Sequence, residues 1–466
     1  MMIVRIIRNI ANVVRVSFTG PFYWLGRLFS GRKKLSAKRT AQVRKHQIKA
    51  GILRYVALFS AAAVVSAVLT GLYYTRHVLP YVPQVIAKIP QGETNPAAWG
   101  EYYQRQWDSY LKSKEISSTP YGGSDYRQPE EQAPYMQILY KGMLDKMDKQ
   151  ERGHPYSLQD VTDAGKKIKS ASCLTCKSAD APNLIQELGD EFFLRPFDAL
   201  RKEVSHPVAC SDCHDPKTMK LRVTREHFIQ TYEKLNKDWE QVTYQEMRTL
   251  VCAQCHTTYY IADKTKKVTL PWLDSADFAS IESYFNEVSF TDWIHPDTKT
   301  PLVKNHHPDY EMFLGGAHQS AGVACSDCHM PFVREGNVKI TSHKLNSPLE
   351  FLAAACTVCH RQNTAYLQER VLSTQQEVAQ LKDFAGNLLA ESVQELAQAV
   401  KTPDADPQLI KEAQTLHRRA FLLFDGISID NSSGFHNPRK SLKTLAQVID
   451  LSHRIKSIAQ KAIGKH

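Results

Sequence analysis

Hydrophobic residues near the C-terminal end of the chain recur at three-, four- and seven-residue intervals. The stretch 366–400 contains one glycine and no proline, and its leucines and valines repeat with this spacing, which predicts one long amphipathic helix. Pro403 and Pro407 end this helix and begin the next, because proline fits a helix start but not a helix interior. We expect two further helices, at 407–424 and 438–463. Strand-like alternation is sparse elsewhere, so the pattern predicts a mainly α-helical fold with little strand.

An uncharged segment near the N-terminal end, 55–75, lies between Arg54 and Arg76. At about 1.5 Å per residue, a helix of this length just crosses a hydrocarbon core of about 30 Å. Thirteen Lys and Arg residues precede the segment and only Arg76 and Lys88 follow it closely. The positive-inside bias therefore predicts a transmembrane helix with the N-terminus in the cytoplasm and residues 77–466 outside, in the periplasm. A signal peptide cleaved near 63–67 is the alternative, and it would export the same body.

The formal net charge of +11 comes from the N-terminal end. The first 92 residues hold fifteen Lys and Arg and no acidic residue, and the remaining 44 basic and 48 acidic residues give the rest of the chain a formal charge of −4. Nucleic-acid binding by the folded body therefore has no support. Isoleucine, phenylalanine and tryptophan interleave with arginine over 3–29. That pattern is typical of an interfacial helix or hairpin on an anionic leaflet, with an unstructured basic tail as the alternative.

All ten cysteines fall into five Cys-x-x-Cys pairs, and four of the pairs are followed at once by a histidine: His214, His256, His329 and His360. Two thiols three positions apart on a tight turn can add to the two vinyl groups of one haem, and the next imidazole can then ligate its iron. Zinc sites would combine two pairs each, thioredoxin-like pairs need a βαβ context, and disulfides would not require a following histidine. The pattern predicts covalent haem c at Cys173–Cys176, Cys210–Cys213, Cys252–Cys255, Cys325–Cys328 and Cys356–Cys359.

The first cysteine pair departs from this rule, because Lys177 follows Cys176. One interpretation is a degenerate site that no longer binds haem. The other is an amine ligand to iron, which coordinates only after losing a proton that free lysine holds until about pH 10. If the opposite face of such a haem is open, substrate binds there.

Haems that only transfer electrons need a second axial ligand each. Four histidines near the haem motifs or in a turn between late helices are candidates: His154, His318, His343 and His436. Position alone does not separate them from four competing histidines: His206, His227, His417 and His453.

Four longer motifs extend these observations. They are Cys-Leu-Thr-Cys-Lys-Ser at 173–178, Cys-Ala-Gln-Cys-His-Thr-Thr-Tyr-Tyr at 252–260, Lys-Asn-His-His-Pro at 304–308 and Cys-Ser-Asp-Cys-His-Met-Pro at 325–331. With them the chain resembles the cytochrome c nitrite reductase family, the ammonia-forming pentahaem enzymes, from about residue 140 to the C-terminus. The resemblance implies five haem c groups, with Lys177 as the proximal ligand of the active haem. It implies four bis-histidine pairs for the others: His214 with His343, His256 with His154, His329 with His436, and His360 with His318.

The family places a histidine, a tyrosine and an arginine around the open face of the active haem. His307 and Tyr259 match the first two by motif, His307 as the candidate proton donor and Tyr259 as a hydrogen-bonding residue. The arginine is expected near position 166, where this chain has Lys166. A lysine keeps the positive charge but lacks the bidentate fork of arginine. Alternatively, Arg127 or Arg152 reaches into the site.

A calcium ion accompanies the active site in this family, and two of its expected ligands are changed here. Thr258 stands where the family has an acidic residue, and His306 stands where the family has a glutamine. Calcium takes several hard oxygen ligands, preferably carboxylates, so these changes disfavour calcium. A lysine or a protonated His306 in place of the ion is a hypothesis.

The resemblance implies an oxidoreductase that carries out the six-electron reduction of nitrite to ammonium. Its electron donor would be a membrane quinol dehydrogenase or a soluble haem carrier, and its long C-terminal helices would form a homodimer interface unless they pack only within one chain. A non-catalytic pentahaem electron-transfer cytochrome and a reductase of hydroxylamine or sulfite are the competing functions. The expected organisation is a basic cytoplasmic or interfacial segment (1–53), a transmembrane anchor (54–76), a pentahaem catalytic domain (77–360) and a helical region that closes it and dimerises (361–466).

Overall fold

The computed structural model describes residues 37–77, 88–123, 133–143, 152–163 and 170–464. The chain divides into two compact units, Met1–Tyr81 and Val82–His466. In the described part of the first unit, helix α2 (Ala37–His77) is long and apolar enough over Gln42–Tyr73 to cross a membrane. It begins well before the predicted span 55–75, because alanine, lysine, arginine and glutamine before that span favour helix as well. The interfacial pattern predicted over 3–29 lies outside the described residues.

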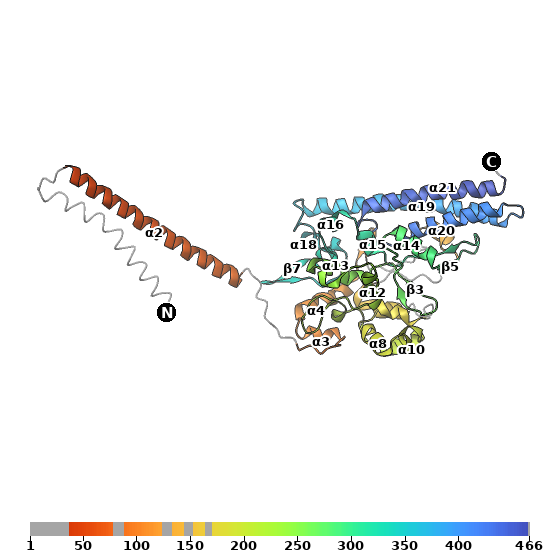
Figure 1. Ribbon diagram of the computed structural model, residues 1–466, viewed down its shortest axis with the longest axis horizontal. Helices are drawn as coiled ribbons and strands as arrows, with labels where there is room; N and C mark the ends of the chain where they lie inside the picture. Colours follow the sequence, from red (N-terminus) through yellow and green to blue (C-terminus); the bar gives the residue numbers. More distant parts are fainter. Residues whose placement is uncertain (1–36, 78–87, 124–132, 144–151, 164–169, 465–466) are drawn as a thin grey trace. The chain divides into compact units, whose positions relative to one another are not determined.

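Three long helices end the second unit: α19 (Thr364–Lys401), α20 (Pro407–Ser428) and α21 (Pro438–Ala462). The three helices predicted from hydrophobic spacing are therefore confirmed within a few residues. Each begins at a side-chain cap, because Asn363, Asp406 and Asn437 accept N–H groups of the first turn, and such caps stabilise a helix by about 1 kcal/mol. Helices α19 and α20 both pack along α21, as Figure 1 shows.

The apolar faces of these helices belong to the main hydrophobic core. Leu389, Leu396 and Leu445 are fully buried, and each such side chain contributes about 1.5–3 kcal/mol on burial. Gly386 lies against Tyr135 of helix α6 (Tyr135–Leu139), where an added Cβ would come within 2.7 Å of the tyrosine ring. The same core continues into residues 133–312, so the long helices pack directly on the part of the unit that holds the cysteine pairs.

The rest of the second unit consists of short helices and two-stranded antiparallel hairpins, so the mainly α fold with little strand is confirmed. The α-helices are α3 (Pro96–Gly100), α4 (Gln104–Leu111), α6, α7 (Ser157–Asp163), α8 (Ala181–Leu188), α9 (Glu191–Leu194), α10 (Phe197–Leu200), α11 (Cys210–Cys213), α12 (Glu226–Lys234), α13 (Tyr244–Ala253), α14 (Phe278–Glu287), α15 (Asp309–Phe313), α16 (Ala317–Ser320), α17 (Cys325–His329) and α18 (Leu352–Ala355). The 3₁₀ helices are η1 (Lys112–Lys114), η3 (His154–Tyr156), η4 (Ala171–Cys176), η5 (Arg201–Glu203), η6 (Trp239–Gln241) and η7 (Pro348–Phe351). The hairpins are β1 (Ser118–Thr119) with β2 (Gly122–Gly123), β3 (Tyr260–Ile261) with β4 (Val268–Thr269), β5 (Trp293–Ile294) with β6 (Pro301–Leu302), and β7 (Phe332–Glu335) with β8 (Val338–Thr341).

The cysteine pairs lie on helical turns or at helix ends, in η4, in α11, at the end of α13, in α17 and just after α18. In the two Cys-Ser-Asp-Cys motifs, the aspartates hold the turn. Asp212 accepts the N–H of Ala209 at 2.7 Å, and Asp327 accepts the N–H of Ala324 at 2.8 Å. Because helical positions three apart lie on one side of a helix, these turns present both thiols of a pair in the same direction.

Candidate functional site

The five cysteine pairs all lie in the second unit, and thiols of different pairs are neighbours. The Cys176 thiol is within hydrogen-bonding reach of Cys255, and the Cys252 thiol is within reach of Cys325. All ten cysteines are free of disulfide bonds. The first pair, which precedes Lys177, therefore lies beside the third pair, and the third pair lies beside the fourth.

Each histidine that follows a cysteine pair faces a second imidazole across a gap of nearly constant width. The ring centroids are 6.1 Å apart for His154 and His256, 6.3 Å for His214 and His343, 6.2 Å for His318 and His360, and 6.4 Å for His329 and His436. Two imidazoles bound to one metal from opposite sides, with bonds of about 2.0 Å, have centroids about 6.3 Å apart. Each of the four gaps is therefore wide enough for one iron atom.

Three of the competing histidines have other partners. His206 Nδ1 lies 3.0 Å from a carboxylate oxygen of Asp180. His227 donates from Nε2 to the Gln254 carbonyl at 3.0 Å, and His417 Nδ1 lies 3.0 Å from the Thr300 hydroxyl. The fourth, His453, is exposed on α21. These contacts favour the four imidazole pairs as the better candidates for metal ligation.

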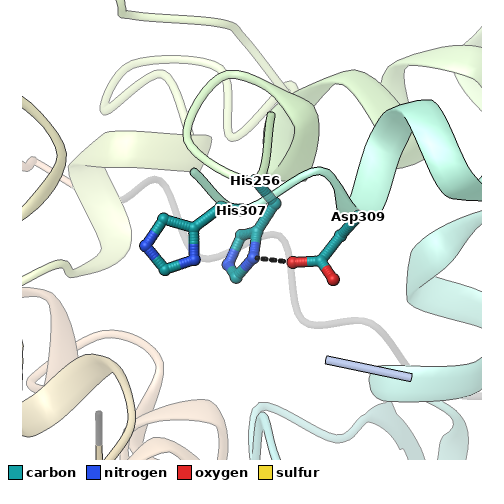
Figure 2. A group of neighbouring side chains, drawn as sticks. All are labelled: His256, His307 and Asp309. Carbon is teal, nitrogen blue, oxygen red and sulfur yellow. Dashed lines mark hydrogen bonds and ion pairs between the residues drawn. The ribbon is translucent and has the colours of Figure 1, made fainter. Parts of the chain in front are cut away.

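The Nδ1 atoms of the candidate ligands have unequal partners. His256 Nδ1 lies 3.1 Å from Asp309 Oδ2, as Figure 2 shows, and His436 Nδ1 lies 3.2 Å from Asp430 Oδ1. Backbone carbonyls are the partners at three other rings: Met219 for His214 at 3.0 Å, Thr341 for His343 at 2.9 Å and Asn346 for His329 at 3.3 Å. A hydrogen bond donated from Nδ1 fixes the tautomer and leaves Nε2 for a metal.

Aromatic and basic side chains gather beside the lysine that follows the first cysteine pair. His306 stacks on Tyr259 with ring centroids 4.6 Å apart and planes 26° from parallel. Burial, followed by the positive charges of Lys304, His307 and Lys177, holds the pKa of His306 well below its usual range. Burial and the neighbouring cations therefore disfavour the hypothesis of a protonated His306 in place of calcium.

His307 lies in the turn before α15. Its φ of +47° is in the left-handed region, which residues other than glycine adopt uncommonly, and its carbonyl accepts the Asp309 N–H at 2.7 Å. One side-chain nitrogen or oxygen each from His256, His307 and Asp309 lies within 4.8 Å of the others, and the two imidazoles are neighbours in Figure 2. The turn therefore keeps the His307 imidazole beside a candidate iron ligand.

The expected replacement for the family's arginine, Lys166, lies outside the described residues, as does the alternative Arg127. The other alternative, Arg152, pairs with Asp160 at 2.5 Å and lies 4.5 Å above the centre of the Tyr156 ring. These contacts hold the Arg152 guanidinium against η3 and α7.

The family profile that matches this chain is that of cytochrome c552, and it covers residues 95–466. The chain belongs to the cytochrome c552 family. Cytochrome c-552 of Bacteroides thetaiotaomicron is 34% identical over 347 residues, which cover 72% of this chain and 70% of the relative. The cytochrome c nitrite reductase subunit NrfA of Nitratidesulfovibrio vulgaris is 33% identical over 432 residues, or 82% of each chain. The resemblance to the nitrite reductase family is confirmed.

A solved structure supports the same fold. The catalytic subunit NrfA of the cytochrome c nitrite reductase from Desulfovibrio desulfuricans, described as having two calcium sites, superposes with a TM-score of 0.77. The NrfA subunit is 30% identical to this chain, and the match covers 81% of this chain and 88% of the NrfA subunit. The chain therefore has the NrfA fold.

The cytochrome c552 family carries covalently bound haem c, and the described residues fit this cofactor. Besides the paired thiols and imidazole gaps, several buried polar atoms near the cysteine motifs have no hydrogen-bond partner among the described residues: Thr175 Oγ1, Arg222 Nε and Arg225 Nε. A buried polar atom without a partner costs free energy unless a ligand or water satisfies it. Haem, with its polar propionate groups, is a ligand that can do so.

The two positions expected to ligate calcium hold a hydroxyl and an imidazole in place of a carboxylate and an amide. Thr258 offers a hydroxyl, which lies 3.4 Å from Asn305 Oδ1, and His306 offers an imidazole where calcium takes oxygen. The Lys304 ammonium lies nearby, 3.0 Å from the Asn305 carbonyl oxygen and 3.9 Å from Asp425 Oδ1. This ammonium brings a positive charge to the same loop, which disfavours a further cation there.

Sequence reasoning missed three buried carboxylates, those of Asp309, Glu311 and Asp430. Glu311 Oε1 accepts hydrogen bonds from Thr257 Oγ1 at 2.7 Å, Thr258 N at 2.9 Å and Trp272 Nε1 at 2.9 Å, whereas its Oε2 has no partner in the described part of the chain. Burial raises the pKa of Glu311 to about 7. The available signal was local, since Asp309 and Glu311 closely follow His307, and Asp430 precedes His436 by six residues.

Proposed function

We propose that this protein reduces nitrite to ammonium at a haem attached through Cys173 and Cys176 and ligated by Lys177. Four further haems, each ligated by one of the four histidine pairs, would deliver the electrons. The overall reaction consumes one nitrite, six electrons and eight protons and yields one ammonium and two waters. The observation that carries the proposal is the environment of Lys177, which follows the one cysteine pair that lacks a following imidazole. The charge of Lys177 acts on His306, which stacks on Tyr259 and directly precedes His307.

The side chains around Lys177 would bind substrate and move protons. When bound, the haem held by Cys173, Cys176 and Lys177 would supply the iron that binds and reduces nitrite, and the remaining haems would supply electrons. His307 would donate protons to the nitrite oxygens, because an imidazole with an ordinary pKa near 6.5 exchanges protons near neutral pH. Tyr259 would donate a hydrogen bond to the substrate, with its ring held by the His306 stack. Lys166 is our proposed source of the positive charge that the family's arginine supplies.

Assays on the purified haem protein test this function. With reduced methyl viologen as donor, we expect one ammonium per nitrite and a high-spin ferric signal that cyanide abolishes. Equal or faster turnover of hydroxylamine or sulfite would reassign the substrate. Five low-spin haems that are inert to cyanide would contradict catalysis and favour an electron-transfer cytochrome.

We also propose that α2 anchors the protein in the cytoplasmic membrane, with the second unit in the periplasm near a quinol dehydrogenase or haem-type donor. The apolar stretch Gln42–Tyr73 supports this, because it is long and apolar enough to cross a membrane and the described residues bury none of it. The full chain should remain in membranes after carbonate washing, whereas residues 82–466 with an export signal should be released. Release of the full chain would point to cleavage or peripheral attachment instead.

The long C-terminal helices are the proposed homodimer interface. Helix α19 exposes two large aromatic side chains, Phe384 at 59% and Tyr366 at 48%, which association of two copies would cover. Light scattering of the exported fragment should give twice the mass of one chain. A monomer at micromolar concentration would show that these helices pack only within one chain.

A further inference from the structure

Two candidate iron ligands donate a hydrogen bond to a buried carboxylate, and three others donate to a neutral backbone carbonyl. The first two are His256, which faces Asp309, and His436, which faces Asp430. We propose that Asp309 and Asp430 are positioning residues that lower the reduction potentials of two adjacent haems, those attached at Cys252–Cys255 and Cys325–Cys328. The proposal rests on the ligation of these haems by His256 and His436 in the proposed function.

Both carboxylates are held in place by other donors. Asn431 donates its N–H to Asp309 Oδ1 at 3.0 Å and its side-chain amide to Oδ2 at 2.9 Å. Asp430 accepts the Ser432 hydroxyl at 2.6 Å and the Gly434 N–H at 2.8 Å. The side chain of Asp309 is 10% exposed and that of Asp430 is fully buried. Their orientation toward the imidazoles is therefore fixed by the fold.

These carboxylates act here as hydrogen-bond acceptors. One ligand atom each from Asp309, Asp430 and His436 lies within 4.8 Å of the others, a spacing that a metal ion could also use. However, each carboxylate oxygen already accepts an N–H or O–H group from His256, Asn431, His436, Ser432 or Gly434. The N–H and O–H donors fill the positions around the oxygens where an ion would bind.

A carboxylate that accepts a hydrogen bond from an imidazole ligand shifts the reduction potential of the iron in one direction. It draws the Nδ1 proton toward itself, which makes the ring a stronger electron donor. Its negative charge, in a poorly screened interior, also stabilises the more positive ferric state. Both effects favour oxidised iron and lower the reduction potential. The haem between His214 and His343 lacks this charge at either ring, because both rings donate to carbonyls.

The two affected haems are consecutive on the route to the Lys177 site. Cys252 of the third pair lies beside Cys325 of the fourth, and Cys255 lies beside Cys176 of the first. A haem of low potential next to the catalytic haem is a strong immediate donor. The inferred role of the two aspartates is therefore to direct electrons from the fourth site through the third to the first.

Redox titrations of isosteric variants test the inference. Asp309→Asn and Asp430→Asn remove the charge with little change in volume. The matched control is Glu311→Gln, a buried carboxylate on the same helix as Asp309 that bonds Thr257, Thr258 and Trp272 rather than an imidazole ligand. Titrations at pH 8, followed by electron paramagnetic resonance and visible absorption, assign a midpoint potential and g-values to each haem. Haem content is measured in parallel from the pyridine haemochrome spectrum.

Each aspartate variant should keep five haems and alter the g-values of the low-spin haem whose ligand it bonds. The midpoint of that haem should rise more than the midpoint of the neighbouring haem, because Asp309 and Asp430 lie close to each other. Glu311→Gln also removes a buried charge but no hydrogen bond to a candidate ligand, so it should raise both potentials by less than the aspartate variants do. Unchanged potentials in both aspartate variants, or an equal shift in Glu311→Gln, would overturn the inference. If Asp309→Asn does not assemble, Asp430→Asn tests the same relationship at a separate haem. Wild-type protein that binds haem but makes no ammonium from nitrite would contradict the proposed function and leave these titrations interpretable.

Discussion

The imidazole of His306 stacks on the ring of Tyr259, with centroids 4.6 Å apart and planes 26° from parallel. The stack joins two loops, one after the third cysteine motif and one before His307. The His306 imidazole stands at the position of the calcium-ligating glutamine expected from the nitrite reductase family. In this protein an aromatic contact therefore connects the two loops that bear the candidate substrate-binding residues.

Loss of the stack should slow nitrite reduction. An aromatic pair is worth about 0.5–1.5 kcal/mol beyond area burial, so His306→Ala should lower kcat roughly two- to tenfold by loosening Tyr259. His306→Phe keeps a stacking ring and is expected to retain most of the rate. Both are measured as ammonium production per haem. Full activity in His306→Ala would show that the stack does not position Tyr259.

Replacement of Lys177, the proposed iron ligand, should separate haem attachment from catalysis. Lys177→His restores an ordinary haem motif, so five haems should remain covalently attached. The neutral amine of lysine is a more basic donor than imidazole, and turnover should fall at least tenfold as the iron loses this donor. Lys217→His, at an exposed lysine, is the matched control. Wild-type turnover in Lys177→His would show that the reaction does not require lysine.

Calcium removal should leave turnover unchanged. The two expected ligand positions hold Thr258 and His306, and the Lys304 ammonium lies nearby, whereas calcium prefers carboxylate oxygens. Activity measured before and after dialysis against a chelator, and again after calcium is restored, checks this expectation. A loss that calcium reverses would show that the protein retains a functional calcium site.

Stability should fall as pH rises from about 4.5 to 7 because of Glu311. Burial raises its pKa to about 7 from a model-compound value of 4.5, so in this range the folded protein binds more protons than the unfolded chain, and the free energy of unfolding decreases with pH. Glu311→Gln keeps an acceptor oxygen for Thr257, Thr258 and Trp272 and should remove this decrease, at most about 3 kcal/mol.

Thermal unfolding of Glu311→Gln and wild type at pH 5, 6, 7 and 8 measures the difference. Glu287→Gln, at an exposed glutamate at the end of α14, is the control and should follow wild type. Parallel pH profiles for Glu311→Gln and wild type would show that another group sets the pH dependence.

Local sequence features determined much of the protein. Haem attachment depends on residues within one helical turn, so five cysteine pairs and the lysine at 177 are visible in the chain itself. The long helices α19, α20 and α21 follow from hydrophobic spacing and from capping residues and prolines at their starts. The apolar stretch in α2 follows from composition, although its helical start at Ala37 does not, because basic helix-forming residues extend it beyond the uncharged span.

Only the tertiary structure decided which distant side chains meet. His154 faces His256 and His214 faces His343 across more than a hundred residues of chain, and spacing alone could not select these histidines from their competitors. The bonds from Asp309 and Asp430 to imidazoles and the stack of His306 on Tyr259 likewise depend on how loops pack. Such contacts join loops and helix ends, whose sequences carry no periodic pattern, so their partners are determined by the packing of the surrounding helices.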